Sequence, residues 1–329
     1  MVRPPSPAHA PVPLSDPFVF GSPECTPPLA ASAVAVGNFD GVHLGHAAIA
    51  RTLQVAAAAA GVPAIALTFD PHPASLVRPG AAPAPLTTPA RRAELLLGLG
   101  LDAVLVQPVN AALVALTAAD FYSTILRGRL GGVAFVEGED FRFGAGRAGD
   151  VSLLGQLAAA DAATLEVVPP VVVDGEPVSS SRLRALVAAG NVSAAAALAT
   201  APYRLRGIVV AGAGRGAGLG FPTANLGDVA TLLPAGGVYA ARATVAGDTT
   251  NPTNRWYPAA VNVGTAPTFD TTIPTVEVHL VGFAGNLYGR TLDVDFLTRL
   301  RETRKFASAD ELQSQLAADV AHALAIAAG

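Results

Sequence analysis

Two histidines, His43 and His46, stand three positions apart in a glycine-rich run that follows an apolar segment and precedes a helical pattern ending near Ala60. At the N-terminus of a helix the backbone N–H groups are unpaired and the helix dipole contributes partial positive charge, so a polyphosphate can bind there. Histidines three apart share one helix face, and each imidazole can donate a hydrogen bond to a phosphoryl oxygen. The pattern predicts a nucleotide site where an α-phosphate is attacked, with further binding residues Gly37, Phe39, Asp40 and Gly41.

A metal site is one alternative interpretation of the histidine pair. Tetrahedral zinc needs three or four protein ligands, and no cysteine or third histidine follows on the same helix, so that His72 is the only near candidate. Two surface histidines without a role are the other alternative. The Gly-x-Phe-Asp-Gly sequence between an apolar strand and a helix favours the phosphate site over both.

The elements around the histidine pair alternate between apolar strands and helical patterns. Helices are expected to begin at Pro89 and Ala118, and strands are expected at residues 33–36, 62–69, 103–107 and 133–136. This alternation is typical of a Rossmann-like parallel sheet covered by helices, whose ligands bind beyond the carboxyl ends of the strands. Three further segments are expected at that edge, namely residues 68–73, 138–144 and 179–184.

A second glycine pattern, Gly-x-Gly-x-x-Gly at residues 144–149, matches the dinucleotide-binding fingerprint. It follows an aromatic and basic loop rather than a strand, and no acidic residue ends a second strand at the expected distance. We therefore do not expect a nicotinamide dinucleotide site.

The helical period ends at Ala201 and Pro202, after which short strand-like runs follow at residues 203–210, 238–245, 259–263, 275–281 and 291–296. Runs of this kind separated by turn residues predict an antiparallel β-barrel. The chain then closes on an amphipathic helix, with a capping box at Ser308 and Glu311 and an apolar stripe of Leu312, Leu316, Val320 and Leu324. The expected domains are a disordered proline-rich extension at 1–28, an α/β domain at 29–201 and a barrel domain at 202–329.

The barrel half contains its own candidate phosphate site. Residues 212–220 include five glycines, among them Gly214, Gly216 and Gly220, whose backbone N–H groups could fold over phosphates. Thr223 and Asn225 point to one side of an extended strand and could share Mg²⁺, and Glu277 could accept a proton from an attacking hydroxyl. A surface turn and a solvated strand charge are the simpler alternatives for each pattern alone.

The composition restricts the classes of protein and partner. The 329 residues carry a net charge of −4, and the densest basic stretch, residues 299–305, is short, so no nucleic-acid surface is expected. The single cysteine, Cys25, cannot form an intramolecular disulfide, which favours a reducing cytoplasm. No apolar stretch is long enough to span a bilayer, and residues 1–28 lack the apolar core of a signal peptide.

From about Ala31 to its C-terminal helix, the chain resembles the prokaryotic bifunctional riboflavin kinase/FAD synthetase family. Residues 37–46 are similar to that family's Gly-x-Phe-Asp-Gly-x-His-x-Gly-His signature, and the other edge segments follow in the expected order. In the second half, residues 219–225 and 276–289 resemble the kinase module's Pro-Thr-Ala-Asn and glutamate-containing segments. The resemblance implies a nucleotidyltransferase domain followed by a riboflavin kinase-like barrel.

Two reactions in sequence are implied by this resemblance. The barrel would transfer the γ-phosphoryl group of ATP to riboflavin, giving FMN, with Thr223 and Asn225 on Mg²⁺ and Glu277 as base. The first domain would let the FMN phosphate attack the ATP α-phosphate, giving FAD and pyrophosphate, with His43 and His46 stabilising the charge. The implied nucleotide-binding residues are Asp140, Ser180, Ser181 and Arg184 for FAD synthesis, and the glycine loop with Thr223 for the kinase. The implied flavin-binding residues are Phe69, Phe141 and Arg301.

Departures from the family pattern are concentrated in the kinase half, where Ala211 and Ala217 replace a common histidine and a common basic residue. Such lost phosphate contacts would weaken nucleotide binding by ~1–3 kcal/mol. The alternative function is therefore FMN adenylyltransferase only, with the barrel as an inactive flavin-binding module. A flavin-binding sensor and a nucleotidyltransferase for another acceptor are further alternatives. The expected partners are riboflavin, FMN and ATP, with no nucleic acid or membrane, and the protein is expected to be a cytoplasmic monomer or weak homo-oligomer.

Overall fold

The computed structural model describes residues 18–20, 29–78, 80, 82–212, 217–248, 256–268 and 271–328. The chain divides into two compact units, of which the first comprises Met1–Pro83 and Pro89–Ser179 and the second comprises Ala84–Thr88 and Ser180–Gly329. The main boundary between the units lies at Ser180, earlier in the chain than the domain boundary expected at residue 202. The reason is that helices α7 (Ser180–Ala188) and α8 (Val192–Leu198) group with the second unit. Helix α8 packs against strands β11 (Tyr203–Val210) and β16 (Thr291–Arg301) of that unit.

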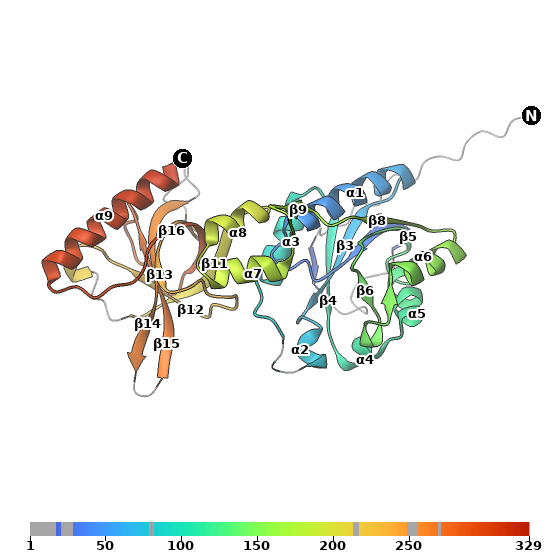
Figure 1. Ribbon diagram of the computed structural model, residues 1–329, viewed down its shortest axis with the longest axis horizontal. Helices are drawn as coiled ribbons and strands as arrows, with labels where there is room; N and C mark the ends of the chain where they lie inside the picture. Colours follow the sequence, from blue (N-terminus) through green and yellow to red (C-terminus); the bar gives the residue numbers. More distant parts are fainter. Residues whose placement is uncertain are drawn as a thin grey trace, which may run out of the picture. The chain divides into compact units, whose positions relative to one another are not determined.

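A six-stranded sheet forms the centre of the first unit, with the strand order β1-β4-β3-β2-β5-β8. Figure 1 shows its strands β3, β4, β5 and β8 beside one another between helices. Every neighbouring pair of strands is parallel, which confirms the predicted α/β fold. The strands are β1 (Phe18–Phe20), β2 (Ser32–Val36), β3 (Ala64–Asp70), β4 (Ala103–Pro108), β5 (Gly132–Gly138) and β8 (Thr164–Val168).

Helices cover both faces of this sheet, so its central strand β2 is buried along its whole length. Leu53 and Leu96 pack on one face, and Phe121 and Leu154 pack on the other. The helices of the first face are α1 (Leu44–Ala60) and α3 (Pro89–Gly98). Those of the second face are α5 (Ala118–Asp120), the π-helical segment η1 (Phe121–Arg127) and α6 (Val151–Ala160).

Strand β1 lies within the leading segment for which disorder is predicted. Phe18, Val19 and Phe20 pair in parallel with residues 104–106 of β4. An apolar run with two aromatic residues has high β-propensity, and it pairs with backbone groups of β4 that would otherwise form an open edge. The prediction of disorder is therefore wrong for these three residues, while residues 1–17 and 21–28 lie outside the described part of the chain.

The Gly-x-Gly-x-x-Gly run lies in an antiparallel hairpin of β6 (Arg142–Phe143) and β7 (Gly149–Asp150), with the 3-10 turn η2 (Ala145–Arg147) between them. It does not follow a strand of the parallel sheet, so its context is not that of a dinucleotide fingerprint. The other short elements of this unit are α2 (Ala74–Val77), α4 (Ala111–Ala115), β9 (Val172–Val173) and β10 (Glu176–Pro177).

A closed barrel forms the second unit, in the order β11-β12-β15-β14-β13-β16. Every neighbouring pair is antiparallel, as predicted, and burial alternates along β11 because every second side chain faces the interior. The remaining strands are β12 (Ala224–Gly227), β13 (Gly237–Val245), β14 (Tyr257–Thr268) and β15 (Thr271–Leu280), and the 3-10 turn η3 (Ala217–Leu219) precedes β12.

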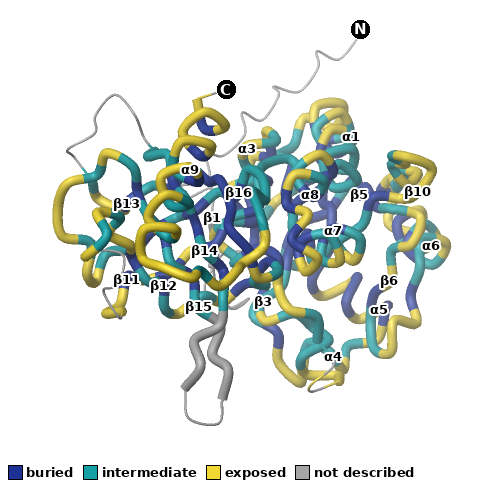
Figure 2. The backbone as a smooth tube through the Cα atoms, turned by 60° about the vertical axis from the view of Figure 1, so that its left-hand side comes forward, coloured by how far each residue is buried: buried dark blue, intermediate teal, exposed yellow. Residues whose placement is uncertain are grey.

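Helix α9 (Ala309–Ala328) packs against β13 and β14 and closes the chain as predicted. Ser308 accepts a hydrogen bond from the Glu311 backbone N–H at 3.2 Å, so one half of the predicted capping box is present. The Glu311 carboxylate accepts from the Ala307 N–H at 3.0 Å instead of the Ser308 N–H. The predicted apolar stripe is wrong at Leu324, which is 40 % exposed. Figure 2 shows that much of the α9 coil is exposed (yellow). The buried positions are instead Asp319, Ala323 and Ala327, because small alanines let the helix approach the barrel closely. Among the described helices, none combines the length and apolar character needed to cross a bilayer.

Candidate active sites

The loop from Gly37 to His43 leaves the carboxyl end of β2 at the switch point of the parallel sheet. From β2 the chain adds β3 and β4 on one side and then β5 on the other, so the loops that follow β2 and β5 diverge there. Open α/β sheets bind their ligands at such a point. Asp140, which follows β5, acts electrostatically on the His43 imidazole, so these two segments meet at one edge as expected.

The loop after β2 stores backbone strain. Phe39, Gly41 and Val42 have φ angles of 46°, 81° and 34°, in the left-handed region that only glycine adopts without cost. The side chains of Phe39 and Val42 are buried at 4 % and 0 % exposure, and this burial offsets the strain. A strained turn held by its own anchored side chains keeps the following helix N-terminus in one position.

His43 and His46 form a reciprocal cap at the start of α1. The His46 backbone N–H donates to His43 Nδ1 at 3.4 Å, and the His43 backbone N–H donates to His46 Nδ1 at 3.3 Å. The two rings stack with their centroids 3.6 Å apart, and the Phe39 ring meets His46 edge-on at 5.1 Å. Gly45 permits this packing, because a Cβ atom there would lie 3.1 Å from the His43 ring.

The cap determines the protonation state of both imidazoles. Because each Nδ1 accepts a backbone hydrogen bond, each neutral ring carries its proton on Nε2. Burial lowers the pKa of His43 from 6.5 to about 4, although Asp140 and Asp40 act to raise it. Burial also holds the pKa of His46 well below 6.5, and the neighbouring His43 and Arg92 lower it further. At neutral pH the pair therefore presents two Nε2–H donors, which suits phosphoryl oxygens.

Two buried ionisable residues at this edge were missed by the sequence reasoning. Arg92 of α3 bonds to Thr68 and Phe69 at the end of β3 and lies 3.8 Å from the carboxylate of Asp40. Glu137 of β5 accepts a hydrogen bond from the Val36 backbone N–H at 2.8 Å, and burial raises its pKa well above 4.5. A charged residue on an apolar helix face and another inside an apolar strand are the signals that could have identified them.

The other predicted residues of the first unit lie at the same strand ends. Phe69 is half-buried near the end of β3, and Asp140 is exposed in the turn after β5. Phe141 stacks on Phe143 at a centroid distance of 5.4 Å, so its ring is part of a fixed aromatic pair. Their roles toward nucleotide and flavin stay predictions.

Ser180, Ser181 and Arg184 lie in the second compact unit, in the first turns of α7. The Arg184 Nε–H donates to the Ala84 carbonyl at 2.8 Å, within the same unit. The helix begins at Ser180 as the predicted serine cap requires, and the phosphate contacts of these three residues stay predictions.

A polar row crosses three strands on the outer face of the barrel. Asn225 of β12 lies directly opposite Glu277 of β15, and Glu277 lies opposite Asn262 of β14. The neighbours of each in its strand are buried in the interior, so the three polar side chains share the outer side. The Asn262 Nδ2–H donates to Glu277 Oε2 at 3.5 Å, which makes Asn262 a further member of the site that the sequence reasoning missed.

The residues around this row suit a hard cation and a phosphate. Thr223 is exposed two positions before Asn225, directly before β12, and its hydroxyl is a third oxygen ligand type besides the amide and carboxylate of the row. A Cβ atom at Gly212 would collide with the Asn225 side chain, so only a glycine fits at this position beside Asn225. Gly220 has φ 86°, which favours glycine, whereas Gly214 and Gly216 lie outside the described residues. Within the described part of the chain, no cluster of three histidine, cysteine or acidic side chains could hold a metal.

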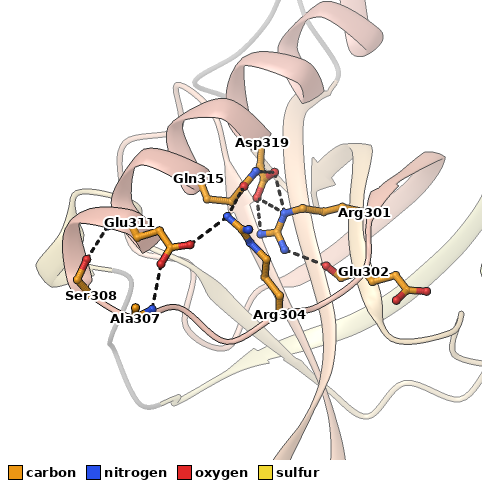
Figure 3. Close-up of polar contacts among 8 residues, drawn as sticks. All are labelled: Arg301, Glu302, Arg304, Ala307, Ser308, Glu311, Gln315 and Asp319. Carbon is orange, nitrogen blue, oxygen red and sulfur yellow. Dashed lines mark hydrogen bonds and ion pairs between the residues drawn. The ribbon is translucent and has the colours of Figure 1, made fainter.

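The resemblance implies flavin binding by Arg301, but its guanidinium has a partner within the barrel unit. It donates to both carboxylate oxygens of Asp319 in α9, at 2.7 to 3.2 Å, and to the Glu302 carbonyl at 2.9 Å (Figure 3). This ion pair holds the end of β16 against α9. A flavin contact by Arg301 stays a prediction.

Comparison with known proteins identifies both halves. A family model described as FAD synthetase matches residues 26–182, and one described as riboflavin kinase matches residues 199–327. The bifunctional riboflavin kinase/FMN adenylyltransferase of Pseudomonas fluorescens is 38 % identical over 294 residues, which cover 89 % of this chain and 92 % of that protein. The chain belongs to this bifunctional family.

A second relative and a solved structure also match about nine-tenths of this chain. The protein of the same description from Escherichia coli K12 is 35 % identical over 292 residues, covering 89 % of this chain and 91 % of that one. A crystal structure described as a macrolide-efflux protein from Streptococcus pneumoniae aligns with 92 % of this chain and 97 % of its own, with a TM-score of 0.81 and 30 % identity. Both units of the fold therefore occur together in a solved structure.

Proposed function

We propose that this chain makes FAD from riboflavin in two steps, each in its own unit. In the barrel, the ribityl 5′-hydroxyl oxygen of riboflavin attacks the γ-phosphorus of ATP, the bond to ADP breaks, and the hydroxyl proton passes to Glu277. In the α/β unit, a phosphate oxygen of FMN attacks the α-phosphorus of a second ATP and pyrophosphate leaves. Neither step needs a covalent enzyme intermediate.

The observation that carries the adenylylation half is the reciprocal cap of His43 and His46. It leaves two neutral Nε2–H donors beside the positive end of α1, which is bare of acidic residues in its first turn. Donors that are fixed before substrate binds stabilise charge that develops on the α-phosphate during attack without reorganisation. We assign phosphate binding to the loop from Gly37 to His43, called the phosphate loop, in which Gly37, Phe39, Asp40 and Gly41 shape the backbone. Asp140 and Phe141 are assigned to lining the same site.

The polar row supports the kinase half. Glu277 lies between Asn225 and Asn262 in the register of the barrel, and the Asn262 amide donates to its carboxylate. Thr223 and Asn225 would hold Mg²⁺, which when bound neutralises charge on the ATP phosphates. The substitutions Ala211 and Ala217 remove possible phosphate contacts but leave this row complete.

The same assignment gives the protein its expected substrates, compartment and oligomeric state. Its substrates are small molecules, and we propose a cytoplasmic enzyme that is a monomer or weak homo-oligomer. The single cysteine supports a reducing compartment.

Two variants of one histidine test the adenylylation half. His43→Asn keeps an oxygen that can cap α1 but has nothing in place of Nε2, whereas His43→Ala removes both. Both are expected to lose FAD formation from FMN by about 100-fold or more, while riboflavin phosphorylation in the same sample persists. Only His43→Ala is expected to lose about 1 kcal/mol of stability. Undiminished FAD formation by His43→Asn would overturn the assigned role.

Glu277→Gln tests the kinase half with the opposite pattern. It is expected to lower FMN formation from riboflavin by about 100-fold while FAD still forms from supplied FMN. Unchanged phosphorylation of riboflavin by this variant would reject Glu277 as the base. If the wild-type chain forms FAD only from supplied FMN, the barrel is a flavin-binding module and the adenylyltransferase-only alternative holds.

A further inference from the structure

A buried arginine connects three elements beneath the histidine pair. Arg92 projects from α3 with 6 % of its surface exposed. Its Nη1 donates to Thr68 Oγ1 at 2.9 Å and to the Phe69 carbonyl at 3.1 Å, both at the end of β3. Its Nη2 lies 3.8 Å from Asp40 Oδ1, and both side chains of this ion pair are less than one-tenth exposed.

These contacts reach both sides of the strained residue in the phosphate loop. The Thr68 hydroxyl that accepts from Arg92 donates in turn to the Asn38 carbonyl at 3.0 Å. Thr68 thus holds Asn38, and the ion pair holds Asp40. The residue between them is Phe39, with φ 46°. The Phe39 ring meets His46 edge-on. Arg92 therefore contacts the turn that places an aromatic ring against His46.

An arginine at this buried position indicates a role beyond packing. Burying a guanidinium costs several kcal/mol, and well-packed apolar residues would usually stabilise a core at least as well. Arginine provides a planar group with several fixed donors, so it can hold a hydroxyl, a carbonyl and a carboxylate at once. Its charge also acts to lower the pKa of His46, after burial and His43, which favours the neutral imidazole.

We infer that Arg92 is a positioning residue of adenylyl transfer, which holds Asn38, Phe39 and Asp40 in the conformation that orients His46 toward the nucleotide. The inference rests on the role proposed above for the histidine pair. Arg92 itself does not touch the reacting atoms. It acts through Thr68 on one side of the turn and through Asp40 on the other.

The sharpest test removes the link and leaves the arginine in place. Thr68→Val is close in shape but has no hydroxyl, and Thr68→Ser restores the hydroxyl. Thr68→Val is expected to lower kcat for FAD formation from FMN by about tenfold, because small misplacements of reacting groups are costly, while KM for ATP changes by less than about twofold. Thr68→Ser is expected to recover most of the lost kcat.

A second pair of variants addresses the arginine. Arg92→Lys keeps the charge but cannot hold all three partners, so its kcat is expected to fall by about tenfold or more. Arg91→Met removes the neighbouring arginine of α3, which pairs with Glu94 instead, and is the matched control with unchanged kcat. Thermal unfolding of every variant reports whether the first unit remains folded, and riboflavin phosphorylation reports separately on the second unit.

Three results would overturn the positioning role of Arg92. A rise in KM for ATP with unchanged kcat for Arg92→Lys would show that Arg92 binds substrate directly, which overturns the inference. Loss of FAD formation in proportion to a lowered unfolding temperature would show a structural role only, which also overturns it. Full activity of folded Thr68→Val and Arg92→Lys would overturn it too. His43→Ala, measured in the same assay, separates the two proposals. If His43→Ala forms FAD at the full rate, the proposed role of the histidine pair fails. If His43→Ala is inactive while Thr68→Val and Arg92→Lys are fully active, only the role of Arg92 fails.

Discussion

Arg301 of β16 and Asp319 of α9 form an ion pair in which the carboxylate side chain is only 3 % exposed. Two guanidinium nitrogens donate to the carboxylate, and Gln315 donates to its Oδ1 at 2.9 Å (Figure 3). A residue predicted to bind flavin thus attaches the last helix to the barrel.

Removing the charge of Asp319 is expected to destabilise the barrel unit. Asp319→Asn leaves the guanidinium, which is one-fifth exposed, without its counter-charge, so the free energy of unfolding should fall by about 2–3 kcal/mol. Urea unfolding followed by the fluorescence of Trp256, the single tryptophan of the chain and part of this unit, measures the change. Arg304→Gln breaks the exposed pair with Glu311 and should cost less than about 1 kcal/mol. Equal effects of the two variants would contradict the importance of burial.

The His43 imidazole is expected to stay neutral well below pH 6.5. Its pKa in the folded chain is about 4, so the stability that depends on the neutral ring is fully present above pH 6.5 and is lost as the pH falls through 4. Protonation would also turn Nδ1 into a donor facing the His46 N–H and break the cap. Nuclear magnetic resonance of the ring should show an Nε2–H tautomer and no titration between about pH 8 and pH 5.5, whereas the urea-unfolded chain should titrate near 6.5. A folded-state midpoint near 6.5 would refute this prediction.

Glu137 is expected to make the first unit less stable as the pH rises. Its folded pKa lies well above 4.5, so the carboxyl keeps its proton in the folded chain while the unfolded chain releases it. Stability is therefore complete below pH 4.5 and declines by up to about 1.4 kcal/mol per pH unit until the folded pKa is reached. Glu137→Gln still accepts from the Val36 N–H and should remove this decline.

Thermal inactivation of FAD formation from pH 5 to 8 measures this difference, because that activity reports on the first unit. The exposed Glu139→Gln is the matched control, with an effect within about 0.5 kcal/mol at every pH. Parallel pH profiles for Glu137→Gln and the wild type would show that Glu137 is ionised in the folded chain.

Gly45→Ala is expected to separate stability from activity. Alanine favours a helix over glycine by about 1 kcal/mol, but its Cβ would lie 3.1 Å from the His43 ring and displace it. FAD formation from FMN should fall by about tenfold or more without loss of thermal stability. Gly155→Ala in α6 meets only Leu165 at 3.5 Å, so it should stabilise the chain and leave kcat unchanged. Full activity of Gly45→Ala would show that the position of the His43 ring is not critical.

Features that depend on residues close along the chain could be predicted from the amino-acid sequence alone. The alternation of strands and helices, the parallel sheet, the barrel and the cap at Ser308 follow from local periodicity and from hydrogen bonds within one turn. The chemical types of the two sites, histidines at a helix start and Thr-x-Asn before a glutamate strand, were readable for the same reason. Disorder at residues 18–20 was predicted wrongly because their partner β4 lies more than eighty positions further along the chain.

Contacts between residues far apart in the sequence became known from the folded chain. Strand order brings Glu137 to the Val36 N–H, register places Asn225 and Asn262 on either side of Glu277, and helix packing commits Arg301 to Asp319 and Arg92 to Asp40. A buried charge must find its partner wherever the whole fold places one, and that position depends on the burial of many apolar residues at once. Local sequence contains no record of that partner, so such contacts are known only once the chain is folded.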